Sequence, residues 1–280
     1  MKQRFTILLF LLPTILAVSP VMAQTADELH QLAASGGRTP AETAVSVGKS
    51  LLGKPYEAHT LEGGGNEELV VNLRTFDCTT FLETALALSL AHHEIGSYPH
   101  NPDKLDASFR KFLTRLRYRN GQINGYASRL HYFSDWLRDN DRKGLLRDIS
   151  HELPGSMTVA KSVNYMTAKT WRYPSMSDPA VFKQIALTES AVSQQSFYFV
   201  PKKNLRTAEK SLREGDIIMI MASRPGLDMK HCGLAVWQNG RVHLLHASSK
   251  QSEVMITRQS LTDYVLANRW LSGIRVARLR

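Results

Sequence analysis

The chain has 280 residues, of which 43% are hydrophobic, and its formal net charge is +10 at pH 7. It contains no repeat and no low-complexity segment, so we exclude a repeat array and predict one large domain with its own core. Its two cysteines allow at most one disulfide.

The first 23 residues have the features of an export signal. Lys2 and Arg4 precede an apolar stretch at residues 5–18, and Val21-Met22-Ala23 matches the small-residue pattern of a signal-peptidase site. The apolar stretch is too short for a transmembrane helix, and no cysteine follows the cleavage point to carry a lipid. We therefore predict a signal peptide at 1–23 and a mature chain secreted across the inner membrane, most simply into a periplasm, with no stable membrane anchor.

Positive charge is concentrated in one segment. Residues 104–147 contain eleven Lys or Arg against four Asp, a net charge of +7. In a cytoplasmic protein such a segment would suggest nucleic acid, but an exported protein meets anionic envelope polymers and peptides instead. We expect no nucleic-acid partner, and solvated helix faces explain the charge equally well.

The first two thirds of the chain are predicted to be mainly helical. Thr39-Pro40-Ala41-Glu42 combines a capping box with proline at the first helical position, and Gly53 follows the last turn of that helix. A glycine-rich stretch at 63–65 and an extended segment at 69–71 then lead to Cys78. The other predicted helices are residues 26–34, 78–92, 103–117, 128–140 and 179–193.

Cys78 lies at the start of one of these helices, with Asp77 as its predicted N-cap. The positive end of the helix macrodipole favours a thiolate over a thiol. Because the thiolate is the nucleophilic form, Cys78 is a candidate catalytic nucleophile. A cysteine in an apolar helix more often serves packing, so position alone does not decide between the two roles.

The last third of the chain is predicted to form an antiparallel sheet. Gly215-Asp216 precedes a continuous apolar run, and Asn239-Gly240 is the strongest short hairpin signal. The predicted strands are residues 217–221, 232–237, 241–247, 253–257 and 274–279, with a helix at 261–268 before the last. Helices followed by an antiparallel sheet predict an α+β fold.

A two-residue turn at Asn239-Gly240 places two histidines on one face of the sheet. Opposed residues then have numbers that sum to 479, so His231 faces Ser248, and His246 shares the face of Ser248. Residues opposed across a hairpin share a face, as do alternate residues along a strand. Small residues beside the histidines predict that the helix of Cys78 packs on that face.

The same argument directs Cys232 to the opposite face, with Leu234 and Val236. There it is predicted to be a small core residue, the common role of a free cysteine. A disulfide between Cys78 and Cys232, which would remove the nucleophile, is therefore disfavoured.

Together these residues suggest nucleophilic catalysis. Cys78 would attack a carbonyl carbon, His231 would take its proton and later donate one to the leaving amine, and His246 or Ser248 would orient His231. Backbone N–H groups at the helix start would stabilise the oxyanion. Cysteine and histidine are also zinc ligands, but no Cys-x-x-Cys or His-x-x-x-His spacing is present, and we expect no metal and no other cofactor.

Four motifs together resemble the NlpC-type cell-wall cysteine peptidases, which are papain-like enzymes of permuted order. They are Gly53-Lys54-Pro55-Tyr56, Asp77-Cys78, His231-Cys232-Gly233-Leu234-Ala235-Val236 and His246-Ala247-Ser248. The resemblance implies an α+β, papain-like fold in which the nucleophile helix packs on an antiparallel C-terminal sheet. It also implies a triad of Cys78, His231 and His246, with Tyr56 near the thiolate to assist the oxyanion.

Two further segments, and the separation of about 150 residues between Cys78 and His231, resemble the N-acetylmuramoyl-L-alanine amidase-like branch. The segments are Leu69-Val70-Val71-Asn72-Leu73-Arg74 and Ser128-Arg129-Leu130-His131-Tyr132. The sequence departs from the commoner motif at Thr79-Thr80, where Ser-Gly is usual. The branch implies a single catalytic domain at 24–280 with a helical and irregular insertion at about 95–205.

The amidase-like branch implies hydrolysis of the amide between N-acetylmuramic acid and the L-Ala of the stem peptide, so the expected partners are peptidoglycan or muropeptides. The same triad would serve a D,L-endopeptidase that cuts between D-Glu and the diamino acid, or a thiol acyltransferase. A non-catalytic cell-wall-binding protein is a further alternative.

Substrate specificity is expected from the insertion. Stem peptides carry free carboxylates, which suit a bidentate arginine. We therefore predict Arg129, His131 and Tyr132 as substrate contacts. The alternative is a helix on which Arg129 is merely solvated.

Overall fold

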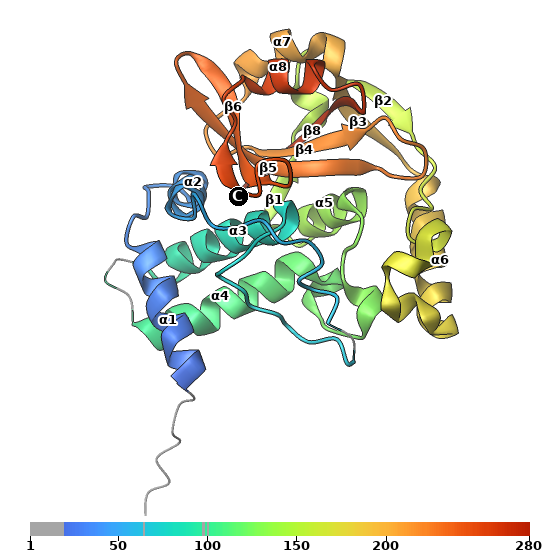
Figure 1. The fold of residues 1–280 in the computed structure, drawn as a ribbon. Helices are drawn as coiled ribbons and strands as arrows, with labels where there is room; N and C mark the ends of the chain where they lie inside the picture. Colours follow the sequence, from blue (N-terminus) through green and yellow to red (C-terminus); the bar gives the residue numbers. More distant parts are fainter. Residues whose placement is uncertain (1–19, 64, 97–98, 100) are drawn as a thin grey trace, which may run out of the picture.

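The computed structural model describes residues 20–280 except 64, 97, 98 and 100. Its elements form three layers: a layer of helices, one antiparallel sheet, and a cover of short helices (Figure 1). The α-helices are α1 (Pro20–Ala33), α2 (Pro40–Ser50), α3 (Cys78–Ile95), α4 (Pro102–Arg117), α5 (Phe133–Arg142), α6 (Pro179–Ser193), α7 (Leu205–Ala208) and α8 (Leu261–Leu266). The predicted α+β class is confirmed, and the papain-like arrangement stays a prediction.

The sheet has the strand order β2-β3-β8-β4-β5-β6-β7, and β1 pairs with β8 beside this path. All of these pairings are antiparallel. The strands are β1 (Leu146–Asp148), β2 (Met157–Ala160), β3 (Ser196–Pro201), β4 (Ile217–Ala222), β5 (Met229–Gln238), β6 (Arg241–Ser248), β7 (Glu253–Ile256) and β8 (Leu271–Leu279). β5 lies between β4 and β6, so its backbone is paired along both edges.

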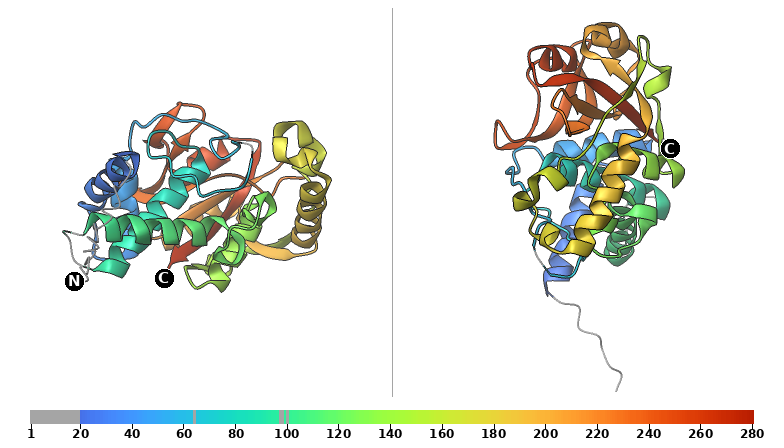
Figure 2. Two further views of the ribbon diagram at one scale, coloured as in Figure 1. Left: turned by 90° about the horizontal axis from the view of Figure 1, so that it is seen from below. Right: turned by 90° about the vertical axis from the view of Figure 1, so that its right-hand side faces the viewer.

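α3 is the central helix of the fold. The twelve residues Thr80–Ala91 are all buried, including the charged Glu83, because other elements pack around the helix. α2 and α4 pack beside it, and β5 and β6 cover its upper face (Figure 1). α7 and α8 cover the other face of the sheet, and α6 lies at the end of the molecule away from α1 and α2 (Figure 2). Cys78 therefore begins the most completely packed helix of the protein.

Most predicted elements are confirmed, with two kinds of error. The helix predicted at 128–140 begins only at Phe133, because Leu130 N donates to Arg117 O at 2.9 Å and keeps the preceding backbone extended. The prediction also missed β1, β2 and β3. These strands are short or lie toward the sheet edge, so they carry little of the alternating apolar pattern that marks a strand.

The predicted signal peptide at 1–23 lies outside the described residues, except for residues 20–23, which belong to α1. Within the described part of the chain, no helix combines the length and the apolar character needed to span a membrane.

Candidate active site

A reciprocal capping box holds the N-terminus of α3. Asp77 Oδ1 accepts a hydrogen bond from Thr80 N at 2.7 Å, and Thr80 Oγ1 accepts one from Asp77 N at 2.9 Å. The predicted N-cap is thus confirmed, and Thr80, a departure from the commoner motif, supplies the second half of the box. Cys78 is the first helical residue and is half-buried at the positive end of the helix.

β5 and β6 form the predicted hairpin in the predicted register. Gln238 opposes Arg241 across a two-residue turn whose φ angles are +50° and +74°, as a type I′ turn requires. His231 Nε2 lies 2.5 Å from His246 Nδ1, and the two rings are nearly perpendicular. The hairpin therefore brings the two predicted histidines together. The hydroxyl of Ser248, the alternative orienting group, accepts a hydrogen bond from the backbone beyond the strand at 3.2 Å.

The predicted direction of Cys232 was wrong. α3 packs against the sheet face that carries Cys232, Leu234 and Val236, whereas α8 covers the opposite face, to which Ala235 belongs. Cys232 Sγ lies 3.1 Å from the carbonyl oxygen of Cys78, so this thiol points toward Cys78. Strand alternation determines which residues share a face, but not which face a helix covers. Both cysteines are free thiols, so the expected absence of a disulfide between them agrees with the structure.

A β-bulge lies next to His231. In the pairing of β4 with β5, Ile220 opposes His231, but the next residue, Met221, opposes Met229. Lys230 is therefore the extra, unpaired residue of β5. Bulges of this kind increase local twist and re-aim neighbouring side chains. His231 itself still pairs with Ile220, a residue of the sheet face that α8 covers, so the bulge lies beside the histidine without changing the face on which it lies.

The side chains of Cys78, His246 and Tyr56 each have a shifted pKa. The hydrogen bond from the Cys232 thiol, together with the charge and hydrogen bond of His231, holds the pKa of Cys78 well below its ordinary value despite burial. Burial, and then His231, lowers the pKa of His246 to about 2, so its ring stays neutral. Burial, and then Cys78, raises the pKa of Tyr56 to about 12. These shifts favour the thiolate form of Cys78, a protonated Tyr56 and a neutral His246.

A cavity of about 270 Å³ opens beside the residues that flank Cys78. Tyr56, Asp77 and Thr79 line it on the side of Cys78, and Arg129 and His131 line it from the segment after α4. Among the residues that the structure describes, no three His, Cys, Asp or Glu side chains are grouped to hold a metal ion.

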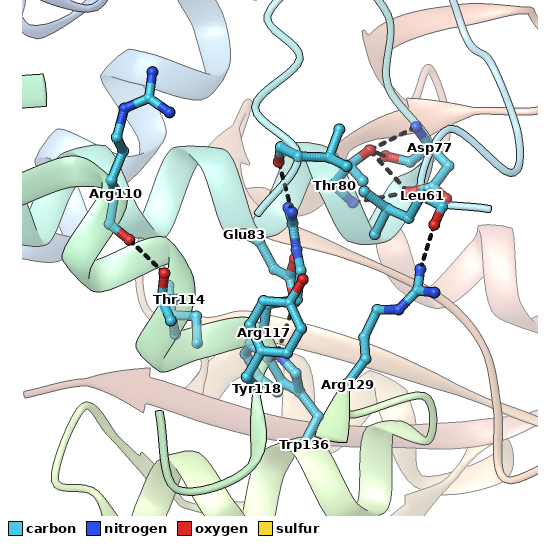
Figure 3. Close-up of polar contacts among 12 residues, drawn as sticks. Leu61, Asp77, Thr80, Glu83, Arg110, Thr114, Arg117, Tyr118, Arg129 and Trp136 are labelled. Atoms are coloured by element: carbon cyan, nitrogen blue, oxygen red, sulfur yellow. Dashed lines mark hydrogen bonds and ion pairs between the residues drawn. The ribbon is translucent and has the colours of Figure 1, made fainter. Parts of the chain in front are cut away.

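Arg129 is a buried residue that holds the wall of this cavity. Its side chain pairs with Glu62 and Glu67 at 3.2 Å each. It also donates to Leu61 O at 3.0 Å (Figure 3). Only 6% of Arg129 is exposed, so the alternative of a merely solvated arginine on a helix is wrong. Its guanidinium forms ion pairs with Glu62 and Glu67, which belong to the loop before α3.

His131 and Tyr132 occupy different places. His131 lines the cavity, stacks on Tyr126 at a ring separation of 4.6 Å, and bonds the backbone oxygen of the same tyrosine through Nε2. Tyr132 does not line the cavity. Its hydroxyl donates to Glu189 at 2.5 Å within a separate apolar cluster near α6.

A buried ion pair below the cavity was not predicted. Arg117 Nε lies 2.7 Å from Glu83 Oε2, and the two side chains are 4% and 2% exposed. Trp136 Nε1 donates to Glu83 Oε1 at 3.2 Å, and Arg117 donates to Val70 O at 2.7 Å (Figure 3). The pair joins α3 to α4, α5 and the cavity wall. No local sequence pattern marks it, because its partners lie 34 residues apart.

Replacing Arg117 by alanine is expected to lower the free energy of unfolding by about 3–5 kcal/mol, because Glu83 would be left charged and unpaired in the core. Urea unfolding followed by circular dichroism measures this change. Arg110→Ala is a matched control on the same helix, since its more exposed pair with Asp106 is worth about 0.2–1 kcal/mol. Equal losses in the two variants would contradict the role of the buried pair.

The free energy of unfolding is expected to fall as the pH falls below 6.5. Burial lowers the pKa of His131 to about 3 and that of His246 to about 2, from an ordinary value of 6.5. The unfolded chain therefore binds more protons in this window, at a cost of about 1.4 kcal/mol per pH unit for each histidine. Asp77, whose pKa burial raises to about 6, acts in the opposite direction between 3.8 and about 6.

Urea unfolding at a series of pH values between about 7.5 and about 4.5 measures this dependence. His131→Gln removes one of the two buried imidazoles and is expected to reduce the slope. A His131→Gln protein with the wild-type slope would show that the folded chain protonates His131 normally.

A model of the N-acetylmuramoyl-L-alanine amidase-like family matches residues 46–274 of the chain. An N-acetylmuramoyl-L-alanine amidase from Bacteroides uniformis is 34% identical, with a TM-score of 0.78 over 86% of this chain and 99% of its own. A protein from Bacteroides fragilis, called a xylanase, is 37% identical, with a TM-score of 0.74 over 83% of this chain and 98% of its own. A Legionella pneumophila protein at 21% identity, with a TM-score of 0.66 over 92% of this chain and 94% of its own, shares the fold. No curated protein sequence matches the chain.

Proposed function

The chain belongs to the N-acetylmuramoyl-L-alanine amidase-like family, and from this premise we propose that it is an exported cysteine hydrolase of peptidoglycan. The bond that it cleaves is the amide between N-acetylmuramic acid and the L-Ala of the stem peptide. The observation that carries the proposal is the His231–His246 contact at 2.5 Å beside a cysteine that begins a helix.

Cys78 is the proposed nucleophile. Its thiolate adds to the lactyl carbonyl carbon of the muramic acid, and backbone N–H groups at the start of α3 stabilise the oxyanion with the Tyr56 hydroxyl. Tyr56 suits this role because its raised pKa keeps the phenol protonated. His231 gives a proton to the L-Ala nitrogen, the C–N bond breaks, and the stem peptide leaves as an amine. Water deprotonated by His231 then hydrolyses the thioester, which releases the muramic acid carboxylate and restores Cys78.

His246 is the proposed orienting residue. Because its pKa of about 2 keeps the ring neutral, its Nδ1 accepts the hydrogen bond from the protonated Nε2 of His231. This bond leaves Nδ1 of His231 for the exchange of protons with Cys78, and it fixes the plane of the His231 ring. The role needs no change in the charge of His246 during the reaction.

The cavity beside Cys78 is the proposed site of the stem peptide. Its volume of about 270 Å³ and its lining by Tyr56, Arg129 and His131 support this role. His131 is proposed to contact the peptide directly. Arg129 is proposed to contact it only through the part of its side chain that lines the cavity, because Glu62 and Glu67 already bind its guanidinium. Tyr132, which was predicted as a third contact, is buried outside the cavity and bonded to Glu189, so we do not propose that it contacts the peptide.

Residues 24–280 are proposed to form one catalytic domain that is exported to the periplasm. The segment 95–205 is the proposed insertion, and it supplies both Arg129 and α6. It is not separate from the sheet, since β1 and β3 pair with β8. Peptidoglycan or its muropeptide fragments are the proposed partners.

A glycosidase is a less favoured function, raised by the xylanase-named structure. Glycoside hydrolysis uses two carboxyl groups that flank the scissile bond. In the described part of the cavity the carboxylates are already committed: Asp77 caps α3, Glu83 pairs with Arg117, and Glu62 pairs with Arg129. Failure to release reducing sugar from xylan is the expected result.

Digestion of purified peptidoglycan by the mature protein, with mass spectrometry of the fragments, tests the proposal. The expected products are intact stem peptides that begin with a free L-Ala amine. Fragments in which L-Ala and D-Glu remain on the sugar would instead indicate a D,L-endopeptidase. No cleavage under reducing conditions would favour a binding protein.

A further inference from the structure

Cys232 occupies a position that the proposed reaction does not use. It directly follows His231 in β5, and its side chain is fully buried. Its Sγ lies 3.1 Å from the carbonyl oxygen of Cys78, the first residue of α3. Cys232 packs in the apolar core with Leu234 and Val236, and in addition its thiol meets the backbone of Cys78.

Two consecutive residues of β5 thus engage the same cysteine. Neighbouring residues on a strand point to opposite faces, so the imidazole of His231 and the thiol of Cys232 approach Cys78 from different sides. The bulge at Lys230 lies immediately before this pair. The tip of α3 is therefore held between a base on one side and a hydrogen-bond donor on the other.

We propose that Cys232 is a positioning residue whose S–H group, bonded to the Cys78 carbonyl oxygen, fixes the tip of α3 against β5 and so keeps the Cys78 sulfur in line with His231. This role rests on the proposed function only in assigning Cys78 as the nucleophile. Cys232 does not touch the substrate, and it acts through Cys78.

The ionisation of the two thiols supports a fixed division of roles. Burial, and then the hydrogen bond to Cys78, raises the pKa of Cys232 well above its ordinary value, so Cys232 keeps its proton. A thiol that always carries its proton is always a donor. The proximity of Cys232, through hydrogen bonding, lowers the pKa of Cys78 and so favours its charged form.

The pH dependence of Cys78 alkylation by iodoacetamide, measured by mass spectrometry of the peptide that contains it, tests this role in the mature protein. Cys232→Ala removes the donor and is expected to raise the apparent pKa of Cys78 by about one unit, which slows alkylation below that pKa about tenfold. Cys232→Ser retains a donor in nearly the same volume and is expected to keep the wild-type profile. The same Ala variant is expected to lose kcat with little change in KM.

Wild-type alkylation in a folded Cys232→Ala protein would overturn the proposal. So would an equal shift in the Ser and Ala variants, because it would mean that packing rather than donation matters. If Cys232→Ala does not fold, Cys232→Val, which fills the space without a donor, takes its place against Cys232→Ser. Alkylation needs no substrate, so its outcome is independent of which bond the peptidoglycan digestion identifies.

Discussion

A Cys78→Ala protein is expected to release stem peptides with a kcat/KM about 10⁴-fold or more below that of the wild type. The reaction loses the atom that bonds to the carbonyl carbon, and the remaining oxyanion donors and binding contacts cannot replace it. The rate of release of peptides with free L-Ala amines, followed by liquid chromatography and mass spectrometry, measures the loss.

Circular dichroism and urea unfolding of the same Cys78→Ala protein provide the control, because a smaller side chain at a half-buried helix start should leave the fold intact. A folded Cys78→Ala protein that retains activity within tenfold of the wild type would refute cysteine catalysis, whichever amide is cut.

A His231→Ala protein is expected to lose about 10³-fold in kcat, because one residue accepts and donates the protons in both halves of the proposed reaction. It should also lose reactivity of Cys78 toward iodoacetamide at neutral pH. The charge and hydrogen bond of His231 help to hold the pKa of Cys78 low, so their removal raises that pKa and lowers the thiolate fraction. Steady-state kinetics and the alkylation profile measure the two effects.

His243→Ala is the matched histidine control for this experiment. His243 lies on the same strand as His246, but its Nδ1 bonds the backbone oxygen of Thr257 at 2.7 Å and it has no contact with His231 among the described interactions. We expect its activity to stay within about twofold of the wild type. Equal losses in the His231 and His243 variants would contradict the assignment of His231 as the base.

Much of the fold could be predicted because its signals are local. Asp77 before α3, Pro40 at the start of α2 and Asp178-Pro179 before α6 are caps that the structure retains. Asn239-Gly240 specifies a hairpin register through its own backbone preferences, without help from distant residues. β1 and β2 carry no comparable signal, since their pairing with distant strands defines them.

The candidate site was predictable in part for the same reason. The register of the hairpin depends on two turn residues, so it could be predicted from the sequence. This register brings His231 and His246 together. The face that α3 covers depends on the whole fold, and the small residues were misleading. A Cβ on Gly233 would lie 2.5 Å from Leu245 O, so this glycine serves the approach of β6 rather than that of a helix.

Long-range ion pairs are the other part that the sequence could not supply. Arg129 bonds Glu67 across 62 residues of sequence, so nothing near Arg129 predicts that it is buried. In the basic segment 104–147, Arg117 pairs with Glu83, and Arg129 pairs with Glu62 and Glu67, carboxylates that lie outside the segment. Part of the positive charge is therefore neutralised inside the protein, and it is not evidence for an anionic partner.

Rapid acid quenching of the wild-type protein during turnover of a muropeptide, followed by mass spectrometry of the peptide that contains Cys78, tests the nucleophile and the cleaved bond together. The expected result is a thioester on Cys78 whose acyl group is the muramic acid with no amino acid attached, because the L-Ala side leaves first. An acyl group that still carries L-Ala and D-Glu, or turnover with another residue acylated in place of Cys78, would contradict the proposed amidase.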